Sequence, residues 1–214
     1  MHFDETDADA WFKRNAAALT VDHPDYLTPV LERQNLLRGT GHHVMEIGAA
    51  NGWRLAALQQ RHPGHRYTAV DLSTAAIAAG VAQFSIDLLD GAAHDVPAND
   101  ASVDLLILSF VLHWVAREQL LATAAEVDRL LKPGGHLVLA DFWPERPAKT
   151  PYHHHPGLWT WKLDHRQLWL AGAGYREVVT EPFSYEGTLE RCMTSVLHKG
   201  EEAGSLYTLA ERPA

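Results

Sequence analysis

The chain is short of cysteine, of long apolar runs and of positive charge. Cys192 is the single cysteine among 214 residues, so no internal disulfide can form and a reducing compartment is favoured. No apolar stretch is long enough to cross a bilayer, and no basic-then-apolar leader stands at the N-terminus. We therefore expect a cytoplasmic protein without a membrane span.

Lysine and arginine together number 18 against 27 aspartates and glutamates, which gives a net charge of -9. Such an excess of negative charge argues against nucleic acid or an anionic membrane as the main partner, although a local basic patch is compatible with the total. The length suits one sizeable core, so residues 1–214 are expected to form a single domain.

Two common phosphate-binding loops are also missing. The sequence has no G-x-x-x-x-G-K-[ST] loop, and a dinucleotide loop starting at Gly48 would need its third glycine where Trp53 stands. The chain has instead an apolar run that contains Glu46 and leads into a turn rich in small residues over 48–52. A ligand can lie against bare backbone at such a turn. A second acid, Asp71, ends the next apolar run, where a carboxylate can hold the ribose hydroxyls of a nucleoside-containing cofactor.

Apolar runs alternate with helical patterns along the chain, which is typical of repeated β-α units and a mostly parallel sheet. The pattern predicts strands over residues 43–47, 66–70, 83–87, 103–109, 136–141, 178–180 and 192–197. It predicts helices near residues 10–19, 28–38, 53–61, 74–80, 117–131 and 165–172. An α/β fold follows, with the carboxyl ends of the strands as the expected ligand-binding edge.

Three motifs carry a resemblance to a known superfamily. The turn at 48–52, with an acid before it and Asp71 some twenty residues beyond, resembles motif I of class I S-adenosylmethionine-dependent methyltransferases. Residues 102–114 resemble the fourth-strand signature of that superfamily, and residues 129–139 resemble its "RLLKPGG" element. The resemblance covers roughly residues 40 to 200. One departure is Ala50, where many members have glycine.

The resemblance implies a Rossmann-like, seven-stranded, mostly parallel sheet with helices on both faces and an antiparallel C-terminal strand, reached through a connection at 182–188. It implies an N-terminal helical cap over residues 1–39 and a catalytic core over 40–200. The implied activity is methyl transfer from S-adenosylmethionine to an oxygen or nitrogen of a small molecule, such as a sugar or a natural-product intermediate. A monomer or a homodimer would suit this activity. An RNA- or protein-directed methyltransferase, and a cofactor-binding protein without catalysis, remain alternatives.

Cofactor residues are implied position by position. Glu46 would orient the loop or meet the methionine amine, and Asp71 would hold the ribose. A helix cap is the other interpretation of Asp71, but Ser73 is already placed to cap the helix that follows. The turn beneath the methionine part would be formed by Gly48, Ala49, Ala50 and Gly52. Leu72 would pack on the adenine.

Other expected cofactor contacts come from more variable segments. Asp87, at the end of the predicted third strand, would meet the adenine amino group, with Asp90 and Asp95 as competitors. Leu88 and Ser109 complete the expected set around the cofactor. Arg14 would meet the methionine carboxylate, or be an ordinary exposed helix charge.

The acceptor site is less determined, because methyl transfer asks mainly for alignment and exclusion of water. A base is useful when the acceptor carries a proton of high pKa, as a hydroxyl does. His113, next to the fourth strand, is a candidate base or a structural histidine. Residues 142–164 are expected to form a substrate lid, in which Tyr152 and His154 are candidate catalytic residues beside His113. No metal site is expected from the histidine triplet at 153–155, because consecutive side chains diverge and no carboxylate stands at ligand spacing.

Overall fold

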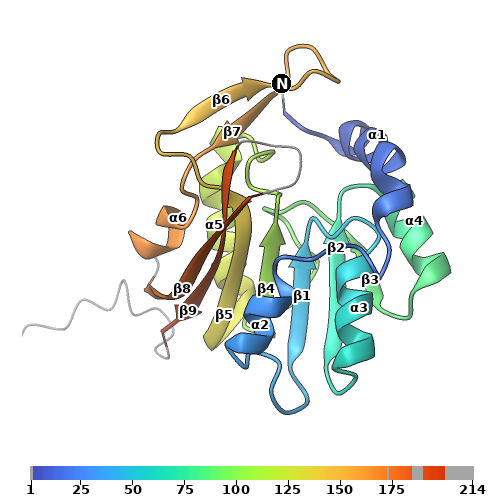
Figure 1. The fold of residues 1–214 in the computed structure, drawn as a ribbon, viewed down its shortest axis with the longest axis vertical. Coiled ribbons are helices and arrows are strands. Elements are labelled where there is room, and N and C mark those ends of the chain that lie inside the picture. The colour runs from blue at the N-terminus through green and yellow to red at the C-terminus, as the bar shows by residue number, and fades with distance from the viewer. Residues whose placement is uncertain (1, 173, 185–189, 201–214) are drawn as a thin grey trace, which may run out of the picture.

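A seven-stranded sheet runs through the middle of the molecule, and helices cover both of its faces (Figure 1). The structure is a computed structural model, and it describes residues 2–172, 174–184 and 190–200. The strands of this sheet are β1 (His43–Ile47), β2 (Arg66–Asp71), β3 (Asp87–Asp90), β4 (Val103–Ser109), β5 (Leu131–Phe142), β8 (Tyr175–Ser184) and β9 (Arg191–Lys199). Their order across the sheet is β3-β2-β1-β4-β5-β9-β8.

Strand directions confirm the predicted fold. Strands β1 to β5 pair in parallel, whereas β9 pairs antiparallel with both β5 and β8. Strand β1 is buried along its whole length, with Val44 packed on one face of the sheet and Met45 on the other. Burial on both faces explains why this strand appears in the sequence as an almost continuous apolar run.

Helices α1 (Glu5–Asn15), α2 (Thr28–Arg33), α3 (Trp53–Arg61), α4 (Thr74–Gln83), α5 (Leu120–Leu130) and α6 (Gln167–Leu170) surround the sheet. Val127 of α5 and Trp169 of α6 belong to the core on one face. Leu31 of α2 and Leu55 of α3 belong to the core on the other. No helix within the described ranges is both long and apolar enough to span a bilayer.

Helix α1 is held over the end of the sheet to which the strand arrows of β1 and β4 point (Figure 1). Its Asp9 carboxylate accepts hydrogen bonds from the Ser73 hydroxyl at 2.7 Å and from the Ala75 backbone N–H at 3.1 Å. These two contacts attach α1 to the first turn of α4. The N-terminal helix therefore forms part of the ligand-binding edge.

Residues 142–164, the predicted lid, contain a small hairpin of β6 (Ala148–Pro151) and β7 (Trp159–Lys162). Its tip contacts α1, because His155 Nδ1 lies 2.6 Å from Asp7 Oδ1 and Arg14 hydrogen bonds to the Tyr152 hydroxyl. The hairpin and α1 thus lie at the same end of the molecule (Figure 1).

The prediction of a third strand at residues 83–87 was wrong. Helix α4 continues to Gln83, and the strand begins at Asp87 and ends at Asp90. Asp87 pairs in register with Thr68 while Asp90 pairs with Asp71, so Asp87 lies at the start of its strand, away from the ligand-binding edge. The other predicted elements form with changed bounds: α1 is shifted toward the N-terminus, α2 and α6 are shorter than predicted, and β5, β8 and β9 are longer. Strands β6 and β7 were not predicted. Most of the predicted connection at 182–188 lies outside the described residues.

Candidate active site

The turn after β1 has three residues in the left-handed backbone region. The φ angles of Gly48, Ala50 and Gly52 are 72°, 51° and 77°. A Cβ atom at Gly48 would stand 2.1 Å from Val111 Cγ2, and one at Gly52 would stand 2.5 Å from Ile86 Cδ1. Both positions therefore require glycine on backbone and packing grounds. Ala50 adopts the same left-handed backbone conformation, which raises its conformational energy because its Cβ atom comes too close to a backbone carbonyl oxygen.

Asp71 connects this turn to the end of β2. Its Oδ2 accepts a hydrogen bond from the Ala50 backbone N–H at 2.6 Å, and its Oδ1 accepts one from the Ser73 N–H at 2.8 Å. The helix cap is Ser73, whose hydroxyl accepts from the Ala76 N–H at 3.0 Å. Burial raises the pKa of Asp71, and the two backbone hydrogen bonds oppose that shift.

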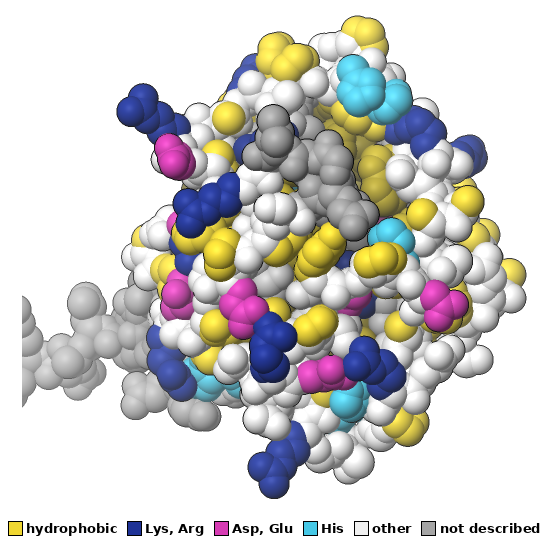
Figure 2. Space-filling model, in the orientation of Figure 1, with side chains coloured by type: hydrophobic (Ala, Val, Ile, Leu, Met, Phe, Trp, Pro, Cys, Tyr) yellow, Lys and Arg dark blue, Asp and Glu magenta, His cyan; other side chains and the backbone are white. Residues whose placement is uncertain are grey.

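Two cavities of about 420 and 550 Å³ adjoin at the carboxyl ends of β1 and β4. The first lies under residues 2–12 and reaches Asp71 and Leu72, whereas the second reaches Glu46, His113 and the hairpin. Residues that line both are Trp11, Gly48, Ala50, Ser109, Phe110 and Trp114. Figure 2 shows hydrophobic side chains gathered in a hollow in the upper part of the molecule, where α1 and the hairpin lie.

One wall of the second cavity is a charged cluster. The Arg54 guanidinium forms an ion pair with Glu46, lies 3.0 Å from Asp25 Oδ1, and donates to the Ser109 hydroxyl at 3.2 Å. Glu46 is 1% exposed, and its Oε2 has no hydrogen-bond partner among the described residues. Burial raises the pKa of Glu46 to about 7 against the opposing charge of Arg54. A buried carboxyl oxygen with unused capacity to accept a hydrogen bond therefore lies beside the second cavity.

Phe110, directly after β4, has a φ angle of 54°. This conformation is an outlier for a bulky side chain, and such strain clusters at functional sites. The Phe110 N–H donates to the Ala140 carbonyl at 2.7 Å, which holds the chain in place as it leaves the sheet. The residue lines both cavities, so the strained turn shapes the point where they meet.

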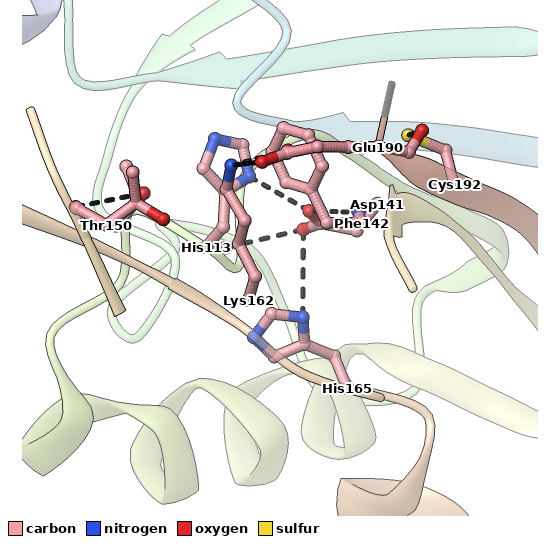
Figure 3. Close-up of polar contacts among 9 residues, drawn as sticks. His113, Asp141, Phe142, Thr150, Lys162, His165, Glu190 and Cys192 are labelled. Atoms are coloured by element: carbon pink, nitrogen blue, oxygen red, sulfur yellow. Dashed lines mark hydrogen bonds and ion pairs between the residues drawn. The ribbon is translucent and has the colours of Figure 1, made fainter. Parts of the chain in front are cut away.

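His113 and Asp141 form a buried pair at the second cavity (Figure 3). His113 Nδ1 lies 2.9 Å from Asp141 Oδ1, and the other ring nitrogen lies on the side away from Asp141 (Figure 3). Burial opposes the charge of Asp141, but the charge and hydrogen bond of His113, with smaller contributions from His165 and the Phe142 N–H, together hold the pKa of Asp141 below its usual value. A carboxylate at one imidazole nitrogen fixes the tautomer that leaves the other nitrogen able to accept a proton.

The structure brings most of the predicted cofactor residues together. Gly48, Ala50 and Ser109 line both cavities, Asp71 and Leu72 line the first, and Glu46 and Ala49 line the second. Gly52 instead is the N-cap residue directly before α3, and Leu88 packs beside Gly52 and Gly80.

Other predicted residues lie elsewhere. Asp87 is exposed and pairs with Arg66 at 3.1 Å. Arg14 contacts Tyr152, and neither residue is among the described residues that line the two cavities. His154 is exposed on the hairpin with its ring 3.9 Å from that of His153. Tyr152 adjoins the cavities only indirectly, because its ring centroid lies 4.7 Å from the ring centroid of Trp114, which lines the cavities.

Sequence reasoning missed several residues that the site uses. Asp141 ends β5, the strand beside β4, so a carboxylate at a neighbouring strand end was the signal that could have paired it with His113. Residues 91–94 line the first cavity because the third strand ends later than predicted. Arg54 and Asp25 carried no comparable signal, since one lies in an ordinary helix and the other in a loop before α2.

Comparisons with known proteins bear on this geometry. A family profile described as "Methyltransferase domain" matches residues 45–139. Malonyl-[acyl-carrier protein] O-methyltransferase 1 of Coxiella burnetii is 29% identical over 136 residues, which are 61% of this chain and 46% of that protein. Residues 45–139 thus match a methyltransferase domain, and this match together with the relatives supports the class I S-adenosylmethionine-dependent methyltransferase superfamily.

Two further proteins are similar to this chain. The ubiquinone/menaquinone biosynthesis C-methyltransferase of Rubrivivax gelatinosus is 34% identical over 113 residues, 50% of this chain and 43% of that one. The structure of Burkholderia thailandensis 1,6-didemethyltoxoflavin-N1-methyltransferase, which contains S-adenosylhomocysteine, matches with a TM-score of 0.66 at 19% identity, over 90% of this chain and 81% of that one. At that identity the likeness establishes the fold. The chain spans about half the length, or less, of the curated relatives it matches.

Superfamily membership confirms the predicted cofactor, S-adenosylmethionine, and the residues present fit it. The first cavity offers Asp71 to a ribose and an apolar side, with Leu72 and Phe12, to an adenine ring. The second offers the unpaired Glu46 Oε2 to an ammonium group. The shared wall at Gly48 has no side chain, so a ligand that spans both cavities can pass along it.

Proposed function

We propose that this methyltransferase acts on a hydroxyl group of a small molecule, and that His113 is the general base. One observation carries the proposal: His113, paired with the buried Asp141, lines the second cavity, and its neighbour Trp114 lines both cavities. A hydroxyl is a poor nucleophile until its proton is removed, so a base at this position is useful for oxygen and unnecessary for a neutral amine.

The chemistry required of the chain is then limited. S-adenosylmethionine supplies, when bound, a methyl group that its sulfonium has already made electrophilic. His113 Nε2 would take the proton of the acceptor hydroxyl as the oxygen bonds to the methyl carbon and the bond between that carbon and sulfur breaks, which leaves neutral S-adenosylhomocysteine. The Asp141 carboxylate would stabilise the imidazolium that results. Asp141 also keeps the imidazole in the tautomer that can accept this proton.

Residues 1–39 act in this proposal as a cap over the first cavity, and residues 142–164 act as a lid beside the second. Support comes from the lining of the first cavity by residues 2–12 and from Lys162, which lines the second. The contacts of His155 with Asp7 and of Tyr152 with Arg14 allow cap and lid to exclude water together.

The acceptor has the size of a small molecule in this proposal. The second cavity, at about 550 Å³, lies within the range of ordinary ligand pockets. Its lining combines the aromatic rings of Tyr26, Phe110 and Phe142 with the Lys162–Glu190 ion pair, so a ring bearing a polar group would suit it. The C. burnetii relative is named for O-methylation and the R. gelatinosus relative for C-methylation, so the relatives leave the accepting atom open.

The test compares turnover with cofactor binding. Release of S-adenosylhomocysteine is measured with a panel of phenols, catechols, hydroxy acids and sugars, each beside its O-methylated counterpart. We expect turnover with a hydroxylated member only, and a loss of about 100-fold or more in His113→Asn. His153→Asn, an exposed histidine of the hairpin, is the matched control and should retain turnover. Full activity in a folded His113→Asn enzyme that still binds S-adenosylhomocysteine would overturn the role of His113.

A further inference from the structure

A second histidine approaches the other carboxylate oxygen of Asp141. His165, which follows β7, is 0% exposed, and its Nδ1 lies 3.8 Å from Asp141 Oδ2 (Figure 3). Neither of its ring nitrogens has a hydrogen-bond partner among the described residues. The proposed chemistry at His113 does not involve this side chain directly.

An unpaired polar group in the interior is costly. A buried nitrogen without a partner loses its hydrogen bonds to water and gains none in return, whereas a phenylalanine or leucine of similar volume would carry no such cost. The imidazole is therefore not explained by packing alone. The titratable group nearest to it is the carboxylate that orients the proposed base.

The two oxygens of Asp141 are unequally occupied. Oδ1 accepts from His113 Nδ1 at 2.9 Å and from the Phe142 N–H at 2.7 Å. Oδ2 accepts only a long bond, from the His113 backbone N–H at 3.3 Å. The oxygen that faces His165 is thus the one with acceptor capacity to spare, and a shift of less than 1 Å brings Nδ1 within hydrogen-bond distance.

We propose that His165 is a positioning residue for His113: its Nδ1–H hydrogen bonds to Asp141 Oδ2, holds the carboxylate ionised and in place, and divides the attraction that Asp141 exerts on a proton at His113. The proposal rests on the proposed role of His113 as base. A carboxylate that is shared between two imidazoles holds the imidazolium of His113 less tightly, so the base can return its proton after each turnover.

The surrounding charges are consistent with a neutral His165 that donates. Burial lowers the pKa of His165 more than the negative charge of Asp141 raises it, so the ring is an uncharged donor near neutral pH. Asp164 precedes His165 in the chain and is hydrogen bonded to Arg166. On the cavity side, Lys162 of β7 is paired with Glu190 at 2.6 Å, and both line the cavity with His113.

The test is a nitrogen-15 NMR titration of the histidines in the full chain, without cofactor or acceptor. In the wild-type protein we expect His165 to carry its proton on Nδ1. In His165→Phe, the midpoint pH of His113 should rise by about half a unit or more, because Asp141 then acts on His113 alone. His165→Gln, whose side-chain amide can donate to Asp141, should restore a midpoint near that of the wild type.

The outcomes separate the two proposals. A proton on Nε2 of His165 in the wild-type protein overturns the positioning role, and this measurement needs no folded variant. A His113 midpoint that is unchanged in a folded His165→Phe protein overturns it as well, as does a glutamine variant that behaves like phenylalanine. Failure of His113 as base would appear separately, as unimpaired turnover in His113→Asn. His153→Gln is the matched control and should leave His113 unchanged.

Discussion

The two cavities are built in different ways. The first is lined mainly by short continuous segments: residues 2–12, Gly48 and Ala50 of the turn after β1, the end of β2, and residues 91–94. The second is formed by side chains from segments far apart in the chain, among them Asp25, Arg54, His113, Lys162 and Glu190. A turn constrained by φ angles admits few residue types, whereas a wall of side chains can change one residue at a time. The first cavity should therefore bind an invariant ligand and the second a variable one.

The largest expected effect tests whether the first cavity depends on Asp71. Asp71→Ala removes the proposed ribose acceptor together with its hydrogen bonds to Ala50 and Ser73. Affinity for S-adenosylhomocysteine should fall by about 2–3 kcal/mol, measured by calorimetry. Asp87→Asn, the residue once expected at the adenine, is the control and should bind normally. Normal binding by Asp71→Ala would show that Asp71 does not hold the ribose.

Glu46 tests whether the second cavity also contributes to cofactor binding. Its carboxyl has a pKa near 7, so it is charged above that pH and neutral below it. If Oε2 accepts from the ammonium of the ligand, affinity for S-adenosylhomocysteine should weaken about tenfold as the pH falls from 8 to 6. Glu46→Gln should remove most of this dependence, whereas Glu190→Gln should retain it. Identical pH profiles for the wild type and Glu46→Gln would separate Glu46 from the amine.

Ala50 tests the backbone argument. Because its φ angle is 51°, glycine should relieve strain, and Ala50→Gly should raise the free energy of unfolding by about 1 kcal/mol, measured by urea denaturation. Ala49→Gly is the matched control. Ala49 is buried beside it but has no positive φ angle, so its replacement should destabilise the protein. If both variants change the free energy of unfolding in the same direction, the backbone conformation of Ala50 does not decide the effect.

The smallest effect concerns the contact between cap and lid. Tyr152→Phe removes the hydroxyl that Arg14 contacts but keeps the ring on Trp114. Affinity for S-adenosylhomocysteine should fall by about 0.5–1 kcal/mol, because α1 is then held less firmly over the first cavity. His154→Ala, exposed on the same hairpin, should change nothing in this titration. An effect of His154→Ala as large as that of Tyr152→Phe would place the hairpin tip in the cofactor site.

The sequence predicted the first cavity far better than the second. Gly48 follows β1 directly and Asp71 ends β2, and both strands are recognisable in the sequence as apolar runs because they are buried. Their proximity at the cavity could therefore be predicted. Asp87 was misplaced because an alanine-rich helix ran on to Gln83 and moved the third strand by several residues. His113 was foreseen, but its partner Asp141 was not, since their contact depends on the tertiary pairing of β4 with β5.

Arg14 illustrates the limit of such reasoning. A long cationic side chain on a surface helix can reach several anions or aromatic rings, and nothing in the local pattern selects among them. The structure directs it to Tyr152, a residue 138 positions further along the chain. Contacts of that kind are decided by how the N-terminal helix docks, which no motif records.

The position of α1 has a kinetic consequence. Because residues 2–12 line the first cavity and Asp9 fastens the helix to α4, we expect the cofactor to enter and leave through movement of α1. Dissociation of the spent cofactor can then be no faster than that opening. The steady-state turnover rate would then report the opening of α1, whereas a burst of product in the first catalytic cycle would report the rate of methyl transfer.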